Sequence, residues 1–241
     1  MERAFVFDAY GTLFDLVSLQ SHVEARCPGY GAVITQLWRL KQLEYSWLHS
    51  VMGEPFSDFW AVTVQSLQFA LTSAGFMLSS NDVEDIASAF KRLQPFPEVS
   101  EALRALPARR AILSNGSQEM LNALVSHAGL SDVFEFVISV DAARAFKPHP
   151  NCYALVEALM NVPRRDVVFV SSNGFDITGA KRFGFAAVWV NRAPPEDAIA
   201  PVDTSQLYRL LRTQPELLGE VPDRTCASLA YIPEVYRIGG P

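Results

Sequence analysis

Polar side chains follow four short apolar segments of this 241-residue chain, and their types could support covalent hydrolysis. Asp8 comes directly after the first segment, and Ser114 and Asn115 follow the second. Lys147 lies in the loop past the third segment, and Asp176 closes a polar turn after the fourth. If the segments are parallel strands, these groups meet beyond the carboxyl ends, where open α/β sheets bind ligands. A lysine beside Asp8 would favour the ionised carboxylate, which predicts a nucleophile.

The elements that must position these groups are visible as an alternation of short apolar runs and helix-length segments. Runs rich in Val, Ile and Phe are typical of buried parallel strands, and we expect strands at Ala4–Phe7, Arg110–Leu113, Phe136–Val140, Val167–Val170 and Ala186–Val190. Helices are expected at Val99–Leu106, Gln118–Ala128, Asn151–Met160 and Ile177–Phe183. Glu98, Ser117 and Asn151 are candidate N-caps of the first three. The pattern predicts an α/β fold with a Rossmann-like parallel sheet.

A helical insertion interrupts this alternation after the first strand. Helices are expected at Ala32–Met52, Phe59–Ala74 and Val83–Leu93. The first carries two apolar rows, which predicts packing on more than one side. We therefore predict a core domain of residues 1–15 and 95–200 and a helical cap domain of residues 16–94. Residues 201–241 form a Pro-rich tail, expected to be an arm on the core or on a dimer partner, or a partly ordered end.

Composition excludes several classes of function. The net charge of −6 offers no basic stripe for a nucleic acid. No apolar run reaches the roughly 20 residues of a membrane span, and no apolar leader opens the chain. Its three cysteines are scattered, which is typical of a protein from the reducing cytoplasm. An anionic substrate must therefore be bound by local donors.

Five motifs resemble the haloacid dehalogenase superfamily, and in particular its L-2-haloacid dehalogenase branch. They are Phe7-Asp8-Ala9-Tyr10-Gly11-Thr12-Leu13-Phe14-Asp15, Leu37-Trp38-Arg39 followed by Lys41-Gln42-Leu43-Glu44-Tyr45, Leu113-Ser114-Asn115-Gly116, Lys147-Pro148, and Ser171-Ser172-Asn173-Gly174-Phe175-Asp176. The resemblance covers residue 1 to about Arg192. It implies hydrolysis of short L-2-haloalkanoic acids to D-2-hydroxyacids with inversion, through an ester on Asp8. It also implies a homodimer and neither metal nor cofactor.

The resemblance assigns roles to individual side chains. Thr12 and Ser171 would orient the Asp8 carboxylate and Lys147. Asn173 and Asp176 would direct the water that hydrolyses the ester, although Asp176 alone could equally be a helix N-cap.

Substrate contacts come from the loops and from the cap. Ser114 and the backbone after the first two strands, at Ala9, Tyr10 and Asn115, would bind the carboxylate of the substrate. The departing halide would meet Arg39, Asn115 and Phe175, although Arg39 could instead snorkel to solvent. Tyr153 would support Lys147 or Asp176. An apolar wall for the alkyl group of the substrate would come from Tyr10, Leu43 and Phe59, and all four side chains could also be ordinary core.

Two positions disfavour the phosphatases of the superfamily. Phosphatases carry a proton-donating Asp two positions after the nucleophile, where this chain has Tyr10. Their last motif pairs acidic residues for magnesium, whereas here Ser172 leaves Asp176 alone. A halide leaving group needs no proton. Related reactions remain open, namely fluoroacetate defluorination and the opening of a strained ring, and a catalytically silent binding protein is disfavoured by the intact set of Asp8, Lys147 and Asp176.

Overall fold

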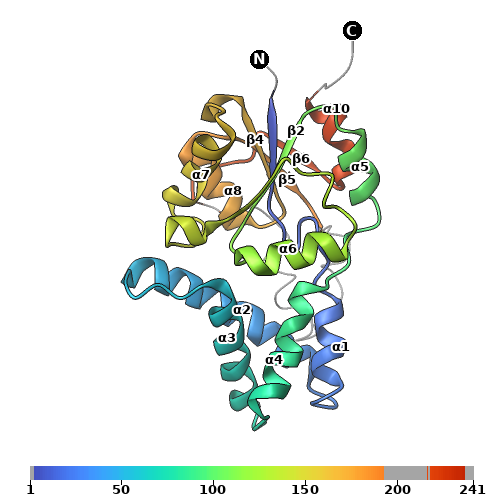
Figure 1. The fold of residues 1–241 in the computed structure, drawn as a ribbon, viewed down its shortest axis with the longest axis vertical. Coiled ribbons are helices and arrows are strands. Elements are labelled where there is room, and N and C mark those ends of the chain that lie inside the picture. Colours follow the sequence, from blue (N-terminus) through green and yellow to red (C-terminus); the bar gives the residue numbers. More distant parts are fainter. Residues whose placement is uncertain (1–2, 193–215, 217, 237–241) are drawn as a thin grey trace.

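The core of the protein is a six-stranded parallel sheet in the order β3-β2-β1-β4-β5-β6 (Figure 1). The structure is a computed structural model that describes residues 3–192, 216 and 218–236. The strands are β1 (Ala4–Phe7), β2 (Arg109–Ser114), β3 (Phe136–Ser139), β4 (Val167–Ser171), β5 (Ala186–Val190) and β6 (Arg224–Cys226). The parallel pairing confirms the α/β prediction, and the first five strands begin and end within one residue of the expected positions.

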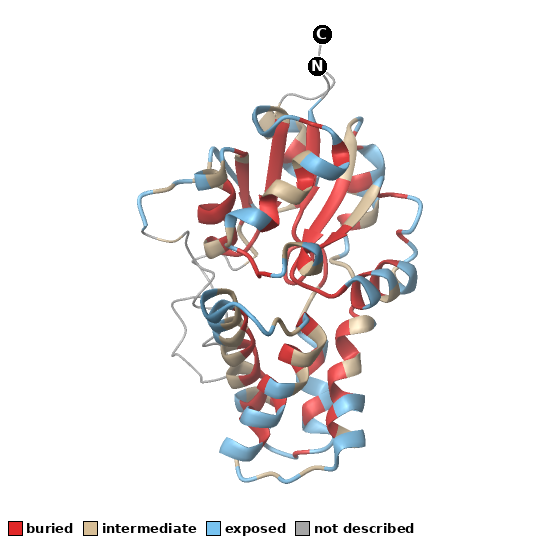
Figure 2. Ribbon diagram, turned by 60° about the vertical axis from the view of Figure 1, so that its left-hand side comes forward, coloured by how far each residue is buried: buried red, intermediate tan, exposed pale blue. Residues whose placement is uncertain are grey.

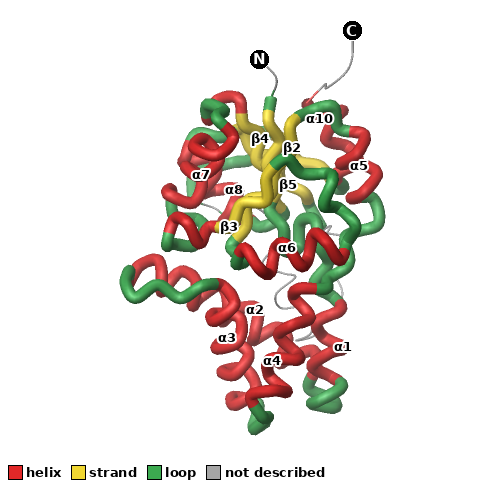
Figure 3. Tube along the Cα trace, in the orientation of Figure 1, coloured by secondary structure: helices red, strands yellow, loops and turns green. Residues whose placement is uncertain are grey.

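Helices cover both faces of this sheet (Figures 1 and 3). On one side lie α7 (Pro150–Met160) and α8 (Gly174–Phe183), and on the other lie α5 (Val99–Ala105) and α10 (Ile232–Tyr236). α6 (Gln118–His127) packs beside β3 and reaches the cap. Because both faces are covered, β1 and β4 are buried along their whole length, as their unbroken apolar sequences predict.

The register of the central strands brings their carboxyl ends level. Phe7 of β1 pairs with Ile112 of β2 and with Val170 of β4. The amide of Asp8 donates to the carbonyl of Val170 at 2.9 Å, which continues the ladder one residue beyond the strand. Figure 1 shows these ends directed toward the helical insertion, so the loops after β1, β2 and β4 face the same space.

The insertion forms a separate helical body below the sheet (Figures 1 and 2). It contains α1 (Ser18–Glu24), α2 (Gly31–Met52), α3 (Phe59–Ser73), α4 (Ser80–Ser88) and the 3-10 turn η1 (Ala89–Lys91). α1 was not expected from the sequence; its two buried residues, Leu19 and Val23, give only a single pair at helical spacing. No helix in the described ranges is long and apolar enough to cross a membrane.

α2 packs on more than one side, as expected, but its last turns are partly exposed. Ile34 and Trp38 are buried in the cap, but Trp47 and Leu48 are about two-fifths exposed and Val51 is 85% exposed. Trp47 contacts Phe175 of the core, whereas Leu48 and Val51 near the end of the helix face outward. Apolar residues at helical spacing report a non-polar face, but they do not say whether the same chain covers it.

The C-terminal segment adds structure that the sequence did not predict. β6 pairs in parallel with β5, and the ring of Tyr236 on α10 meets the ring of Phe5 edge-on at 5.9 Å. A three-residue strand is too short to show a pattern of alternation. Of the predicted tail, residues 201–215, 217 and 237–241 lie outside the described residues.

The predicted N-caps have mixed outcomes. Ser117 accepts from the amide of Met120 at 3.4 Å, as expected for a cap of α6. Glu98 occupies the cap position of α5 but makes no capping hydrogen bond with its side chain. The expectation for Asn151 is wrong, because His149 is the cap of α7 and its ring accepts from the amide of Asn151 at 3.2 Å. Pro150 at the first helical position moves the start of the helix one residue earlier.

Candidate active site

The carboxylate of Asp8 lies at the carboxyl end of β1 with polar partners on both oxygens. Oδ1 accepts from the ammonium of Lys147 at 2.9 Å. Oδ2 accepts from Thr12 Oγ1 at 2.9 Å and from Asn173 Nδ2 at 2.7 Å, with Ser171 Oγ further away at 3.4 Å. The residue is only 4% exposed. These donors stabilise the charged form of a carboxylate that water scarcely reaches.

Lys147 is a fully buried cation between two carboxylates. Its ammonium donates to Asp8 Oδ1, to Asp176 Oδ2 at 2.6 Å and to the carbonyl of Leu113 at 3.0 Å, which uses all three of its protons. Burial alone would lower the pKa of Lys147, but the charges of Asp176 and Asp8 outweigh burial and raise it. The side chain therefore stays protonated at neutral pH and links Asp8 to Asp176.

Asp176 is a buried carboxylate, and its interpretation as a helix cap is wrong. Asn173 occupies the cap position of α8, while Asp176 sits in the first turn and points inward at 0% exposure. Its Oδ1 accepts from the hydroxyl of Tyr153 at 2.7 Å. Burial, opposed by Lys147, raises the pKa of Asp176 to about 6. A carboxylate with a raised pKa is suited to act as a base near neutral pH.

A glycine makes room for the hydroxyl of Tyr153. A Cβ placed on Gly179 of α8 would lie 2.3 Å from Tyr153 Oη and 2.6 Å from a ring carbon of Pro148. The helix that carries Asp176 and the residue after Lys147 can therefore approach one another only because position 179 has no side chain. Tyr153 is also surrounded by Phe169, Phe183 and Phe185, so its ring belongs to the core and its hydroxyl to the site.

Ser172 is used to join the loops after β1 and β4. Its hydroxyl donates to the carbonyl of Gly11 at 2.5 Å, and its amide donates to Thr12 Oγ1 at 2.9 Å. Thr12 in turn orients Asp8, while Ser171 Oγ accepts from the amide of Asn173 at 3.1 Å. Across the described parts of the chain, no group of three His, Cys, Asp or Glu residues is arranged to hold a metal ion. The position that could complete an acidic pair is thus neutral and already bonded.

The loop after β2 contributes oriented donors. Asn115 Oδ1 accepts from the backbone amide of Lys147 at 2.9 Å. The Nδ2 group of the Asn115 side chain therefore points away from this contact. Ser114 is fully buried, and its hydroxyl accepts from the amide of Gly116 at 3.2 Å. This short turn gathers a hydroxyl, a side-chain amide and backbone amides ahead of α6, a combination that favours an anion.

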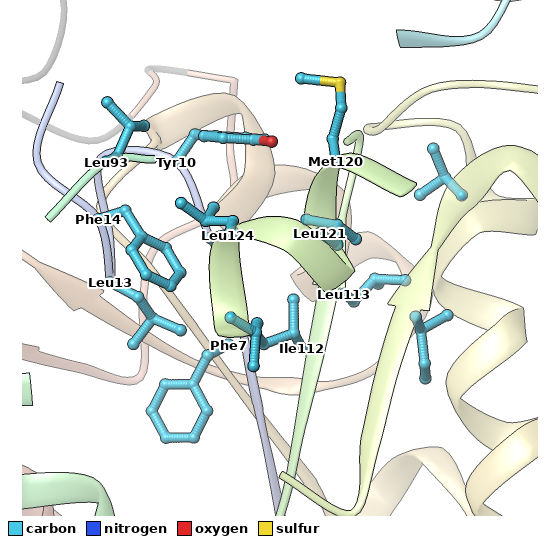
Figure 4. Close-up of a cluster of buried hydrophobic side chains, with 14 of the residues drawn as sticks. Phe7, Tyr10, Leu13, Phe14, Leu93, Ile112, Leu113, Met120, Leu121 and Leu124 are labelled. Atoms are coloured by element: carbon cyan, nitrogen blue, oxygen red, sulfur yellow. The ribbon is translucent and has the colours of Figure 1, made fainter. Parts of the chain in front are cut away.

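The cap provides an arginine and an aromatic wall. Arg39 of α2 is 4% exposed and its guanidinium lies 5.3 Å from the ring centre of Phe90, so the snorkelling alternative is wrong. Tyr10 stacks on Phe59 with ring centres 5.9 Å apart and meets Phe90 at 5.4 Å. Figure 4 shows Tyr10 above the cluster that includes Leu124 and Phe14.

The remaining expected pocket residues are less deeply placed. Phe175 is half-buried and meets Trp47 of α2 edge-on at 5.5 Å, so it lies between the core and the cap. Leu43 is half-buried on α2, and Ala9 is fully buried in the turn after β1, where its carbonyl accepts from the amide of Leu13 at 2.9 Å.

Two buried polar residues were given no role on the basis of the sequence. Gln42 of α2 and Thr63 of α3 are both 0% exposed and continue the hydrogen bonding from Arg39 into the cap. The available signal was a polar side chain three residues after Arg39 on a face that otherwise packs inward. That signal is weak, since most glutamines on helices are solvated.

Taken together, the site contains a carboxylate bonded to donors on both oxygens, a buried cation, a second carboxylate suited to act as a base, and anion-binding donors from core and cap. These groups suit nucleophilic displacement on a small anion followed by hydrolysis of the resulting ester.

Three comparisons with known proteins bear on this geometry. The model of the haloacid dehalogenase-like hydrolases matches residues 2–184. The (S)-2-haloacid dehalogenase of Xanthobacter autotrophicus is 47% identical over 246 aligned positions, covering 98% of this chain and 96% of the relative. Haloacetate dehalogenase H-2 of Moraxella sp. (strain B) is 43% identical over 79% of this chain and 86% of its own length. The solved structure of the Xanthobacter L-2-haloacid dehalogenase with chloropropionic acid covalently bound superposes with a TM-score of 0.93 at 45% identity and covers 100% of both chains.

Proposed function

This chain belongs to the haloacid dehalogenase-like hydrolases, and from that premise we propose that it is an (S)-2-haloacid dehalogenase. The reaction is hydrolytic displacement of halide from short L-2-haloalkanoic acids, which yields D-2-hydroxyacids. The observation that carries the proposal is the surroundings of Asp8, a buried carboxylate bonded to Lys147. Tyr10 stands where a phosphatase has its acid, and burial raises the pKa of Tyr10 further, so this phenol keeps its proton.

In the first proposed step, Asp8 attacks the carbon that bears the halogen from the side opposite the carbon–halogen bond. A carbon–oxygen bond forms, and the halide leaves with its electron pair and without a proton. Arg39, Asn115 and Phe175 surround the leaving halide, and Ser114 with the amides of its loop binds the carboxylate of the substrate. The charge passes from Asp8 to the halide, so a cation near the leaving group stabilises the transition state more than the ground state.

In the second step, water attacks the carbonyl carbon of the Asp8 ester. Asp176 takes a proton from this water, and Asn173, whose amide already contacts Asp8 Oδ2, positions the ester. The bond between the carbonyl carbon and the oxygen of the substrate breaks, and this oxygen takes the proton from Asp176 as the hydroxyacid leaves. The second proton of the water leaves the Asp8 carboxyl group for solvent, which restores the carboxylate. Lys147 stays protonated throughout, because it compensates both Asp8 and Asp176.

The test is halide release from L- and D-2-chloropropionate with EDTA present. We expect chloride from the L-isomer with D-lactate as product, and none from Asp8→Asn. No chloride from the L-isomer would sink the proposal, strict dependence on magnesium would favour a phosphatase instead, and full activity of Asp8→Asn would refute covalent catalysis.

A second substrate class has specific support. One relative is named a haloacetate dehalogenase and is 43% identical to this chain over 193 aligned residues. Haloacetates lack the methyl group of 2-chloropropionate and present the same carboxylate and carbon–halogen bond. Chloroacetate and fluoroacetate therefore belong in the same assay, where fluoride release would extend the activity to the stronger bond.

We also propose that the protein is a cytoplasmic homodimer that works without metal. The exposed apolar residues Trp47, Leu48 and Val51 on one face of α2 support self-association, because a solvent-exposed apolar row of this kind is normally covered. Sedimentation equilibrium checks the dimer, and a monomer at micromolar concentration would contradict it.

A further inference from the structure

A chain of buried hydrogen bonds runs through the cap from Arg39 to the backbone of α3. Arg39 Nη1 donates to Gln42 Oε1, Gln42 Nε2 donates to Thr63 Oγ1 at 2.6 Å, and Thr63 Oγ1 donates to the carbonyl of Phe59 at 2.6 Å. Gln42 and Thr63 are both completely buried. These hydrogen bonds therefore connect Arg39 to a second helix without passing through solvent.

The donor and the acceptor in each of these hydrogen bonds follow from the number of protons that each side chain carries. Thr63 has one hydroxyl proton, and it is donated to the carbonyl of Phe59, so Thr63 can only accept from Gln42. Gln42 must then turn its NH₂ group toward Thr63, which leaves its carbonyl oxygen facing Arg39. The carbonyl of Thr63 accepts from Trp38 Nε1 at 2.9 Å, which fastens the same turn of α3 to α2 from a second point. A rotated amide would place two donors, one from Gln42 and one from Arg39, against each other.

This arrangement holds a side chain that is otherwise flexible. An arginine side chain loses rotamer entropy when it is fixed. Here the guanidinium lies between the amide of Gln42, one helical turn further along α2, and the ring of Phe90. A guanidinium already oriented in the free enzyme needs no rearrangement when halide charge develops.

We propose that Gln42 and Thr63 are positioning residues that orient Arg39 toward the leaving halide. This inference rests on the proposed function. It distinguishes an oriented arginine from one that is merely present in the cap.

The experiment measures kcat/KM for L-2-chloropropionate and L-2-bromopropionate in Gln42→Met, Thr63→Val and Thr63→Ser. kcat/KM reports the steps up to carbon–halogen cleavage. Gln42→Met should lower it by about 10- to 100-fold for the chloride, since a misplaced catalytic group costs about that much. Chloride is the poorer leaving group and concentrates its charge, so the bromide should lose at least threefold less. Thr63→Val should follow the same pattern more weakly, and Thr63→Ser, which keeps the hydroxyl, should restore the wild-type ratio.

A purely structural role predicts something different. General damage to the cap would lower both substrates by the same factor, and an unchanged bromide-to-chloride ratio in Gln42→Met and Thr63→Val would overturn the proposal. If Gln42→Met fails to fold, the matched pair at Thr63 gives the same answer. A second measurement places Gln42→Met in an Arg39→Lys background, where we expect less than a twofold further loss, because the oriented group is already gone. Absence of halide release from the wild type would instead refute the proposed function.

Discussion

Replacement of Lys147 by methionine tests the electrostatic centre of the site. Methionine keeps most of the length of the side chain and removes the ammonium that lies 2.9 Å from Asp8 and 2.6 Å from Asp176. All three groups are almost completely buried. Two carboxylates would then face one another without a compensating cation. Loss of one partner from a buried ion pair costs about 3–5 kcal/mol.

The pH dependence makes this prediction specific. In the wild type the pKa of Lys147 is raised, so its stabilisation is present below the ordinary lysine pKa of about 10.4 and is constant between pH 5 and pH 8. Lys147 lowers the pKa of Asp176, so its removal lifts that pKa above its present value of about 6. A carboxyl group with a raised pKa in the folded state binds a proton on folding, and stability therefore recovers as pH falls. The deficit of Lys147→Met should be largest at pH 8 and smaller at pH 5.

Urea and thermal unfolding at both pH values measure the effect. For a domain of this size, about 3–5 kcal/mol corresponds to a melting temperature lower by roughly 6–20 °C. Lys181→Met is the matched control, because Lys181 pairs with Asp223 at 2.8 Å on the surface, where an ion pair contributes under about 1 kcal/mol. If Lys147→Met were as stable as the wild type, or equally destabilised at pH 5 and pH 8, the buried-charge reasoning would be refuted.

Three further predictions concern hydrolysis of the ester. Asp176→Asn should release about one equivalent of halide per enzyme and then stall with Asp8 alkylated, which intact-protein mass spectrometry detects; sustained wild-type turnover would contradict the assigned role. In the wild type, kcat should fall as pH drops below about 6, because Asp176 must be ionised to accept a proton from water; a flat profile from pH 5 to pH 8 would argue against it. Gly179→Ala should destabilise the protein by about 1–3 kcal/mol and slow ester hydrolysis, since the added methyl group would lie 2.3 Å from Tyr153 Oη; urea unfolding and the size of the halide burst measure the two effects, and an unchanged protein would show that Tyr153 moves freely.

The sheet and the positions of the candidate site residues were predictable from the sequence because their signals are local. Buried parallel strands are continuous apolar runs, and the residue after each run is where a site must form. The locations of Asp8 and Asn115 can therefore be predicted from a few neighbouring residues of the chain. The same reasoning fails for β6, since Arg224–Cys226 has only three residues and no apolar run, and its place beside β5 depends on contacts made far along the chain.

Side-chain roles were harder to predict where two environments share one local pattern. A polar residue at the start of a helix can cap it or turn inward. Asn173 takes the cap position of α8, and the neighbouring Lys147 makes burial of Asp176 tolerable. Val51 illustrates the opposite case, because its helical spacing places it in an apolar row and the structure leaves it 85% exposed. In both cases the burial of the side chain depends on groups that are distant in the sequence. Helical periodicity carries no information about such groups.

The balance of charge in the site supports the proposal that this protein works without a divalent cation. Asp8 and Asp176 bring two negative charges, and Lys147 and Arg39 bring two positive ones, so the empty site is close to neutral. A carboxylate at position 172 would make the site more negative. This chain has Ser172 there, and its hydroxyl and amide are bonded to Gly11 and Thr12. A divalent cation added to a buried, balanced set would carry uncompensated charge, which is costly in a dry pocket. A substrate carboxylate adds only one negative charge, which the donors of the Ser114 loop can meet. The side chain at residue 172 therefore affects the choice of substrate as well as the binding of metal. A carboxylate there would favour a metal ion with a phosphate, whereas serine favours a small organic anion alone.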